Sequence, residues 1–81
     1  MKEFDYVGDF DKGYAPVKSD GKYNFIDEDG NLLSGDWFDQ IYKFMDEEDG
    51  YVYYFDFKGY ALVKLGEKWY RIDMKGNLLN D

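Results

Sequence analysis

Hydrophobic residues in this chain occur in short runs, and each run is closed by Gly, Asp or Asn. Residues 14–18 and 22–27 are β-prone, and Ser-Asp-Gly at 19–21 separates them. Glu-Asp-Gly at 28–30 then leads into Asn-Leu-Leu at 31–33. Runs bounded in this way are typical of hairpins, where glycine supplies the positive φ and aspartate bonds the local backbone. The pattern predicts a small antiparallel meander.

The same order of residues returns in the second half of the chain. Residues 13–18 read Gly-Tyr-Ala-Pro-Val-Lys and residues 59–64 read Gly-Tyr-Ala-Leu-Val-Lys, at an offset of 46 positions (59 − 13). At this same offset, residues 30–33 and 76–79 both read Gly-Asn-Leu-Leu. Repeated matches in one register indicate an internal repeat rather than shared composition.

Ahead of these matches the spacing changes. Residues 4–10 resemble residues 38–44 at an offset of 34 positions (38 − 4). The second copy therefore contains 12 additional residues (46 − 34), near 45–58. We predict that the 81-residue chain is a single domain of two repeats, at about 4–34 and 38–80.

The additional residues have a pattern of their own. Residues 46–50 are polar and end in glycine, and residues 51–57 run through aromatic and apolar positions. We expect residues 51–57 to form one unbroken strand, so that the insertion adds a hairpin to the sheet. On alternation, Phe55 and Phe57 are expected in the core.

Residues 4–10 and 37–44 fit either strands or single helical turns, and we favour strands. Two such repeats can each bury one face against the other, whereas one repeat alone cannot form a core. The predicted fold is therefore all-β, an antiparallel β-meander built from two repeats. It is expected as a curled sheet or as a small two-sheet sandwich.

These motifs together resemble the bacterial WG-repeat family. The pattern is Phe-Asp-x-Val-x-x-Phe, Gly-Tyr-Ala-x-Val-Lys, Gly-Lys-aromatic and Ile-Asp-x-x-Gly-Asn-Leu-Leu. The dipeptide that names the family is Tyr23-Asn24 in one copy and Trp69-Tyr70 in the other, so its glycine is lost twice. The resemblance implies a β-repeat fold and an interaction role, and it transfers no catalytic residue.

The chain contains no Cys and no His, while Phe, Tyr and Trp make up 22% of it. Disulfides, thiolate metal sites and Ser-His or Cys-His catalytic pairs are thereby excluded. A pair of carboxylates for sugar hydrolysis remains conceivable, but no spacing identifies one. We expect a protein that is not an enzyme, with no metal or other cofactor, whose core is built from aromatic rings.

Eighteen acidic residues against ten basic ones give a net charge of −8. Direct binding to nucleic acid is disfavoured, and a protein partner with a basic surface is expected. No apolar run is long enough to span a membrane, and Met-Lys-Glu-Phe-Asp at 1–5 begins no signal peptide. We therefore expect a cytoplasmic protein, located in the host cytoplasm if a phage encodes it.

The acidic sequence at 27–31, Asp-Glu-Asp-Gly-Asn, has some likeness to a calcium-binding EF-hand loop. It lacks the closing bidentate Glu, because Phe38 stands at that position, and the other copy would place Lys75 among the ligands. We interpret both segments as turns in which the aspartate binds the backbone.

The candidate contact surface centres on the insertion. Adjacent carboxylates in an exposed loop can meet Lys and Arg of a partner, and tyrosines beside acidic residues are common at protein interfaces. The predicted partner-binding residues are Asp46, Glu47, Glu48, Asp49, Tyr54, Asp56 and Tyr42. Tyr54 and Asp56 are expected to be exposed on the face opposite the core.

The leading functional prediction is a non-catalytic protein-binding module with an acidic, tyrosine-rich surface. One alternative is a small phage-encoded inhibitor, of the anti-CRISPR or anti-defence type, that acts as an acidic mimic of nucleic acid. Another is a carbohydrate-binding module of the aromatic-platform type. Salt dependence separates them, because charge-based mimicry weakens with ionic strength and stacking on sugars does not.

Overall fold

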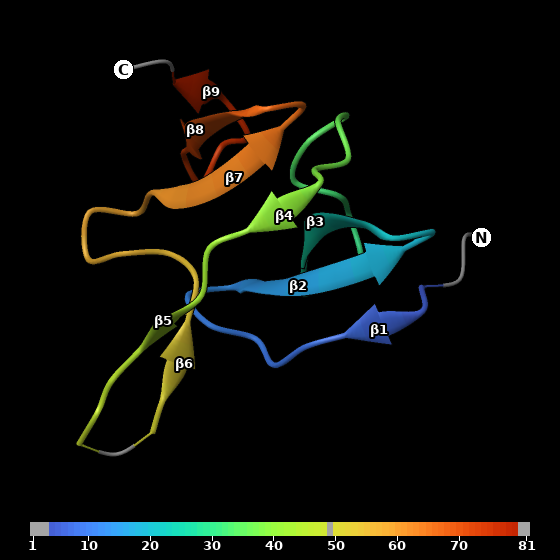
Figure 1. Ribbon diagram of the computed structural model, residues 1–81. Helices are drawn as coiled ribbons and strands as arrows, with labels where there is room; N and C mark the ends of the chain where they lie inside the picture. Colours follow the sequence, from blue (N-terminus) through green and yellow to red (C-terminus); the bar gives the residue numbers. More distant parts are fainter. Residues whose placement is uncertain (1–3, 49, 80–81) are drawn as a thin grey trace.

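The computed structural model describes residues 4–48 and 50–79, and this part of the chain is built from β-strands without helices (Figure 1). The strands are β1 (Tyr6–Val7), β2 (Tyr14–Ser19), β3 (Lys22–Asp27), β4 (Gln40–Ile41), β5 (Phe44–Met45), β6 (Val52–Tyr53), β7 (Ala61–Leu65), β8 (Lys68–Ile72) and β9 (Leu78–Leu79). They form a sheet β1-β2-β3, a sheet β4-β7-β8-β9 and a separate ribbon β5-β6, all antiparallel. The predicted all-β antiparallel class is confirmed. In residues 4–48 and 50–79, no helix has the length and apolar character needed to cross a membrane.

The two larger sheets repeat the same strand pairing. In the first sheet β1 pairs with β2, and in the second β4 pairs with β7. The corresponding residue pairs are Tyr6 with Lys18 and Val7 with Val17, then Gln40 with Lys64 and Ile41 with Val63. These pairs are related by the same offsets, 34 positions on one strand and 46 on the other, that the sequence shows.

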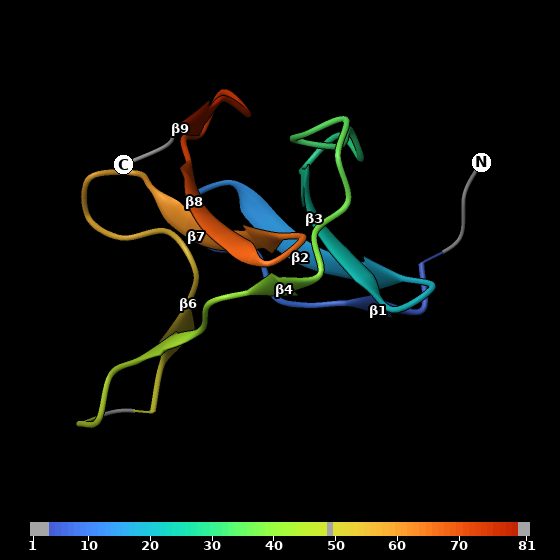
Figure 2. The same ribbon diagram turned by 45° about the horizontal axis from the view of Figure 1, so that its top comes forward.

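One backbone joint connects the first sheet to the second. The N–H of Tyr23 donates to the carbonyl of Phe38 at 2.7 Å, and the N–H of Phe38 donates to the carbonyl of Tyr23 at 2.7 Å. This pair places the residue two positions before β4 against β3, so the two repeats lie side by side (Figures 1 and 2). We call it the repeat joint.

The main core lies where the two repeats meet. Its fully buried side chains come from both of them: Phe25, Phe38, Phe55, Ala61, Val63 and Ile72. A smaller cluster in the first repeat consists of Ala15, Val17 and Ile26, with Phe4 and Trp37 packed against it. Neither sheet alone contains the main cluster, so the two repeats bury side chains against each other.

The insertion differs from the prediction in two ways. Only Val52–Tyr53 is strand, and β5-β6 forms a ribbon that projects away from both sheets rather than joining one (Figures 1 and 2). Phe55 is buried as expected, whereas Phe57 is 90% exposed. The cause is Asp56, whose carboxylate accepts the N–H of Lys58 and of Tyr60, both within 3.0 Å. A tight turn therefore replaces the predicted alternation directly after Phe55.

Candidate functional site

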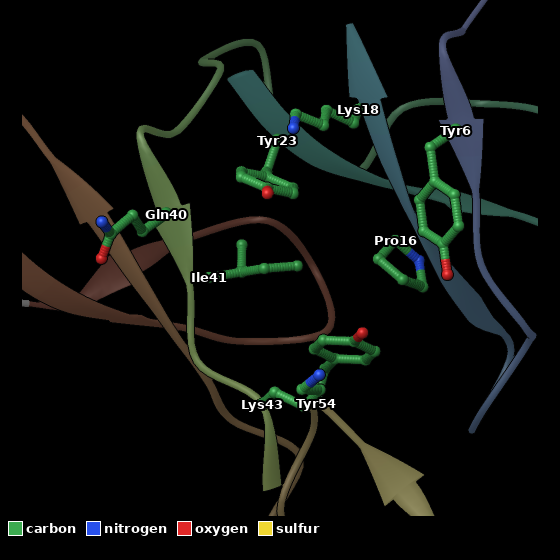
Figure 3. Close-up of a pocket in the computed structure, with 8 residues that line it drawn as sticks. All are labelled: Tyr6, Pro16, Lys18, Tyr23, Gln40, Ile41, Lys43 and Tyr54. Carbon is green, nitrogen blue, oxygen red and sulfur yellow. The ribbon is translucent and has the colours of Figure 1, made fainter. Parts of the chain in front are cut away.

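A groove of about 600 Å³ lies between the two sheets, beside the repeat joint (Figure 3). Four strands and the segments next to β4 and β6 contribute its lining. The lining residues are Tyr6, Pro16, Lys18, Tyr23, Gln40, Ile41, Lys43 and Tyr54. Because both repeats supply walls, the groove depends on their being joined.

Cross-strand register brings three of these side chains into one row. Tyr6 on β1 pairs with Lys18 on β2, and Lys18 in turn pairs with Tyr23 on β3. Directly paired residues on an antiparallel sheet project to the same face. The ammonium of Lys18 lies 5.4 Å from the centre of the Tyr23 ring, a cation–π distance. This row forms one wall of the groove (Figure 3).

Tyr54 lies across the groove from that row and is half-buried. Its ring contacts the core at Phe25, with ring centres 6.0 Å apart in an edge-to-face arrangement. Burial raises the pKa of the Tyr54 hydroxyl above the 10.0 that is usual for tyrosine, and nearby Tyr6, Tyr23 and Asp9 add to this. The hydroxyl is therefore a neutral hydrogen-bond donor near neutral pH.

The charge of the groove is opposite to that of the whole protein. Lys18 and Lys43 are among the lining residues, and the lining that the described part of the chain provides includes no Asp or Glu. The chain as a whole carries a net charge of −8. Three tyrosines and Pro16 supply apolar and aromatic surface between the two ammonium groups. The groove can therefore accept an extended, partly apolar segment that carries negative charge.

Asp46, Glu47 and Glu48 of the predicted acidic surface lie between β5 and β6, at the tip of the ribbon that projects from the two sheets (Figure 1), and none of the three lines the groove. The side chains of Asp46, Glu47 and Glu48 are exposed, and Asp49 lies outside the described residues. One carboxylate oxygen of Asp46 accepts the N–H of Glu48 at 2.9 Å, and its carbonyl accepts the N–H of Gly50 at 2.8 Å. Asp46 thus shapes the turn, while Glu47 and Glu48 face solvent.

Aromatic rings support this ribbon along its length. Tyr53 stacks on Phe44 at 5.1 Å between ring centres, and Tyr42 meets Phe44 edge-on at 4.8 Å. The hydroxyl of Tyr51 donates to the Asp11 carboxylate of the first repeat. The exposed, predicted contact residue Tyr42 therefore lies at the base of the ribbon rather than at its acidic tip.

Lys12 adds a second connection between the ribbon and the first repeat. Its ammonium donates to the carbonyl of Phe55 at 3.2 Å and lies 5.5 Å from the centre of the Tyr53 ring. Asp11 thus holds the ribbon near its turn, through Tyr51, and Lys12 holds it near its base, through Phe55.

Asp56 has a structural part in the molecule, like two other aspartates. Its carboxylate accepts two backbone N–H groups, and Asp27 and Asp73 each do the same at 2.9 Å. The N–H of Asn31 is the largest cause of the lowered pKa of Asp27, and the N–H of Asn77 has this effect on Asp73. The interpretation of the Asp-x-x-Gly segments as backbone-binding turns is confirmed.

The six predicted contact residues that the structure describes therefore fall into separate places. Tyr54 lines the groove, Tyr42 lies at the base of the ribbon with Asp46, Glu47 and Glu48 at its tip, and Asp56 forms a turn. Sequence reasoning passed over the groove residues Tyr6, Lys18 and Lys43. The register of β1 on β2, which places Tyr6 beside Lys18, is the feature that links two of them, and the sequence pattern alone did not define that register. Lys43 had no such signal, because it reaches the groove only through the joining of the repeats.

Comparison with known proteins bears on the repeat itself. The family model described as WG containing repeat matches residues 2–23 and 50–69, together just over half of the chain. No curated protein and no solved structure matches the chain. The two matched stretches fall in the first and second copies that the sequence pattern and the strand pairing both define. The chain therefore belongs to the family of WG containing repeats.

Proposed function

We propose that this protein is a non-catalytic protein-binding module that holds an extended segment of its partner in the groove. The observation that carries this proposal is the lining itself, in which three tyrosines surround a space flanked by Lys18 and Lys43. Tyrosine offers a large contact area with few rotatable bonds, together with a hydroxyl for hydrogen bonding. These properties suit recognition of a peptide backbone.

The charge of the lining indicates which segment fits. The two ammonium groups favour an aspartate or glutamate, or a chain-terminal carboxylate, on the partner. The aromatic walls and Pro16 favour apolar or proline residues beside it. The proposed ligand is thus a short acidic segment with apolar neighbours, bound in an extended conformation.

The β5-β6 ribbon supplies a second contact of opposite sign. Glu47 and Glu48 at its tip are exposed, so they are accessible to Lys or Arg on the same partner. Exposed charges at the rim of an interface mainly accelerate association and contribute little to final affinity. We therefore assign affinity to the groove and steering to the ribbon.

A displayed library of random peptides tests the groove. The unmodified protein is expected to enrich acidic peptides that contain proline or aromatic residues, and the variant carrying Lys18→Glu and Lys43→Glu is expected to lose them at least tenfold. Lys58 and Lys75 are exposed and lie outside the groove lining, so the variant carrying Lys58→Glu and Lys75→Glu is a matched charge control. Enrichment of the same peptides by the double variant would contradict the proposal.

Variation of the salt concentration tests the division of labour. Replacing Glu47 and Glu48 with Ser should lower the association rate for a basic partner at low salt and leave dissociation nearly unchanged. Binding that vanishes steeply with salt and depends only on the ribbon would instead favour the acidic mimic of nucleic acid. Binding of sugars in the groove with no response to salt would favour the carbohydrate module.

A further inference from the structure

The repeat joint consists of more than its two backbone hydrogen bonds. Beside the reciprocal bonds of Tyr23 and Phe38, the ammonium of Lys22 pairs with the carboxylate of Asp39 across the joint. The other oxygen of Asp39 accepts the N–H of Gly66 at 2.8 Å, which fixes the position of the carboxylate. The β3 side thus contributes a backbone edge and a cation, and the β4 side contributes a backbone edge and an anion.

Both halves of this joint occur a second time, at the outer ends of the molecule. The offset of 46 relates the β3 half to Lys68 and Trp69, and the offset of 34 relates the β4 half to Phe4 and Asp5. The Asp5 carboxylate accepts the N–H of Asp20 at 3.0 Å, which is the counterpart of the bond that fixes the carboxylate in the joint. The same chemical groups are therefore presented in the same local setting.

The backbone of Trp69 faces outward. Trp69 pairs with Lys64 on β7, and the carbonyl of Lys64 accepts the N–H of Asp39 on its other side, at 2.8 Å. The backbone groups of Lys64 therefore face β4, and Lys64 and Trp69 form a pair that exchanges no hydrogen bonds. In such a pair the N–H and C=O of the partner face the other way, so those of Trp69 point away from β7. Within the described ranges, no segment stands against Trp69 as Phe38 stands against Tyr23.

Burial of the side chains shows the same difference between the joint and the ends. Phe38 is fully buried, whereas its counterpart Phe4 is only half-buried. Tyr23 is half-buried, whereas its counterpart Trp69 is 41% exposed. Each end of the molecule therefore has an aromatic residue that is more exposed than its counterpart in the repeat joint.

We propose that copies of this chain associate head to tail by rebuilding the repeat joint between molecules. Trp69 of one copy exchanges backbone hydrogen bonds with Phe4 of the next, and Lys68 pairs with Asp5 across the contact. The contact is heterologous, so each added copy presents a new end and assembly grows until the chain of copies closes. This inference does not depend on the function proposed for the groove.

The positions of the two ends support association between molecules rather than within one. Phe4 precedes β1 and Trp69 lies in β8, and these two strands are well apart in both views (Figures 1 and 2). β3 and β4 lie between them in the order of pairing. One molecule therefore cannot satisfy both of its own ends, and a second copy carries the complementary half.

Sedimentation equilibrium of the full chain, from about 10 µM to about 1 mM at low ionic strength, tests the proposal. The weight-average mass is expected to rise with concentration beyond that of one chain. Lys68→Asp and Asp5→Lys should each weaken association about tenfold, because each places like charges across the contact. The exposed Lys58→Asp changes net charge equally and should have no such effect.

Charge exchange separates a specific contact from a general effect of charge. Equimolar mixing of the Lys68→Asp and Asp5→Lys proteins restores opposite charges at every contact, so association should return. A single-chain mass for the unmodified protein at every concentration would overturn the proposal. Failure of mixing to restore association, with both variants folded by circular dichroism, would overturn it too, as would an equal loss in Lys58→Asp.

Discussion

The two repeats have the same strand pairing, but they contribute differently to the core. Phe10 and Phe55 each precede the aspartate of the turn that leads into Gly-Tyr-Ala, yet Phe10 is 47% exposed and Phe55 is 1% exposed. The Phe55 ring lies 5.0 Å from that of Phe25 and 5.6 Å from that of Tyr14, both in the first repeat. The second repeat thus reaches across and fills the interior of the first.

This difference shows how an insertion can alter a repeat without disturbing its sheet. The insertion forms its own ribbon, β5-β6, and the turn at Asp56 then returns the chain to the position where β7 begins. Between the ribbon and the turn, the chain places Phe55 inside the core, with Tyr54 packed against it. Backbone hydrogen bonds maintain the pairing of the strands, while Phe55, a side chain of the insertion, completes the core.

The largest expected effect comes from removing that ring. Phe55→Ala should lower the free energy of unfolding by about 3–5 kcal/mol, because it leaves a cavity between the repeats. Phe10→Ala should change it by less than about 0.5 kcal/mol, because Phe10 is largely in solvent. Urea titrations followed by tryptophan fluorescence measure both. Equal losses would break the comparison between the repeats.

The second pair of variants compares Gly30 with Gly76, which hold the same position in the Asp-x-x-Gly turns at 27–30 and 73–76. Gly30 and Gly76 have φ of 88° and 89°, so alanine is strained in both turns, at about 1–2 kcal/mol. A Cβ on Gly76 would also overlap the carbonyl oxygen of Leu33, whereas a Cβ on Gly30 meets open space. Gly76→Ala should therefore cost about 3 kcal/mol or more in unfolding free energy, and Gly30→Ala about 1 kcal/mol.

Thermal denaturation at one pH measures the loss of stability in Gly30→Ala and in Gly76→Ala. The matched φ values cancel the backbone strain, so the excess in Gly76→Ala reports the contact between the repeats. If both variants melted at the same temperature, the approach of the second turn to Leu33 would not contribute to stability.

The smallest expected effect concerns pH, and here the repeats should behave alike. The pKa of Asp27 and that of Asp73 lie below the 3.8 that is usual for aspartate, chiefly through backbone N–H donors. A lowered pKa means that the folded state favours the carboxylate. The resulting stability is complete above the unfolded pKa and is lost as the pH falls through the lower, folded pKa.

Melting temperatures of Asp27→Asn and Asp73→Asn between pH 2 and pH 7 test this sign. Each variant should melt below the unmodified protein near pH 7, and the gap in melting temperature should narrow as the pH falls below 3.8, the usual pKa of aspartate. The narrowing should be similar in the two variants. A gap that widened on acidification would contradict the assignment of these carboxylates to the turns.

Much of the fold follows from the sequence because it rests on local rules. The turn residues and the two offsets identify the strands of both repeats, and the pairing of Ala15 with Ile26 recurs as Ala61 with Ile72. These features depend on short-range hydrogen bonding and alternation, which the sequence displays directly. The same rules failed at Phe57, where alternation was extended through an Asp-x-x-Gly turn of the kind recognised elsewhere.

What the sequence concealed depends on contacts between distant segments. Asn24 is fully buried, and its amide donates to the carbonyls of Ser34 and Asp36 at 2.9 and 3.1 Å. The periodicity of the sequence cannot reveal a buried asparagine of this kind. The cost of burying its amide is offset by hydrogen bonds to two carbonyls, and only the folded loop brings those carbonyls to it. The groove was concealed for the same reason, because Lys43 and Tyr54 meet the first repeat only after the repeats join.

The Asp-x-x-Gly turns also bear on how the chain folds. Each is closed by hydrogen bonds between residues four apart, such as those from Asn31 to Asp27 and from Asn77 to Asp73. Loops this short cost little chain entropy to close, whereas the pairing of Tyr23 with Phe38 encloses a longer stretch. We therefore expect the hairpins to nucleate first and the docking of one repeat on the other to limit the folding rate.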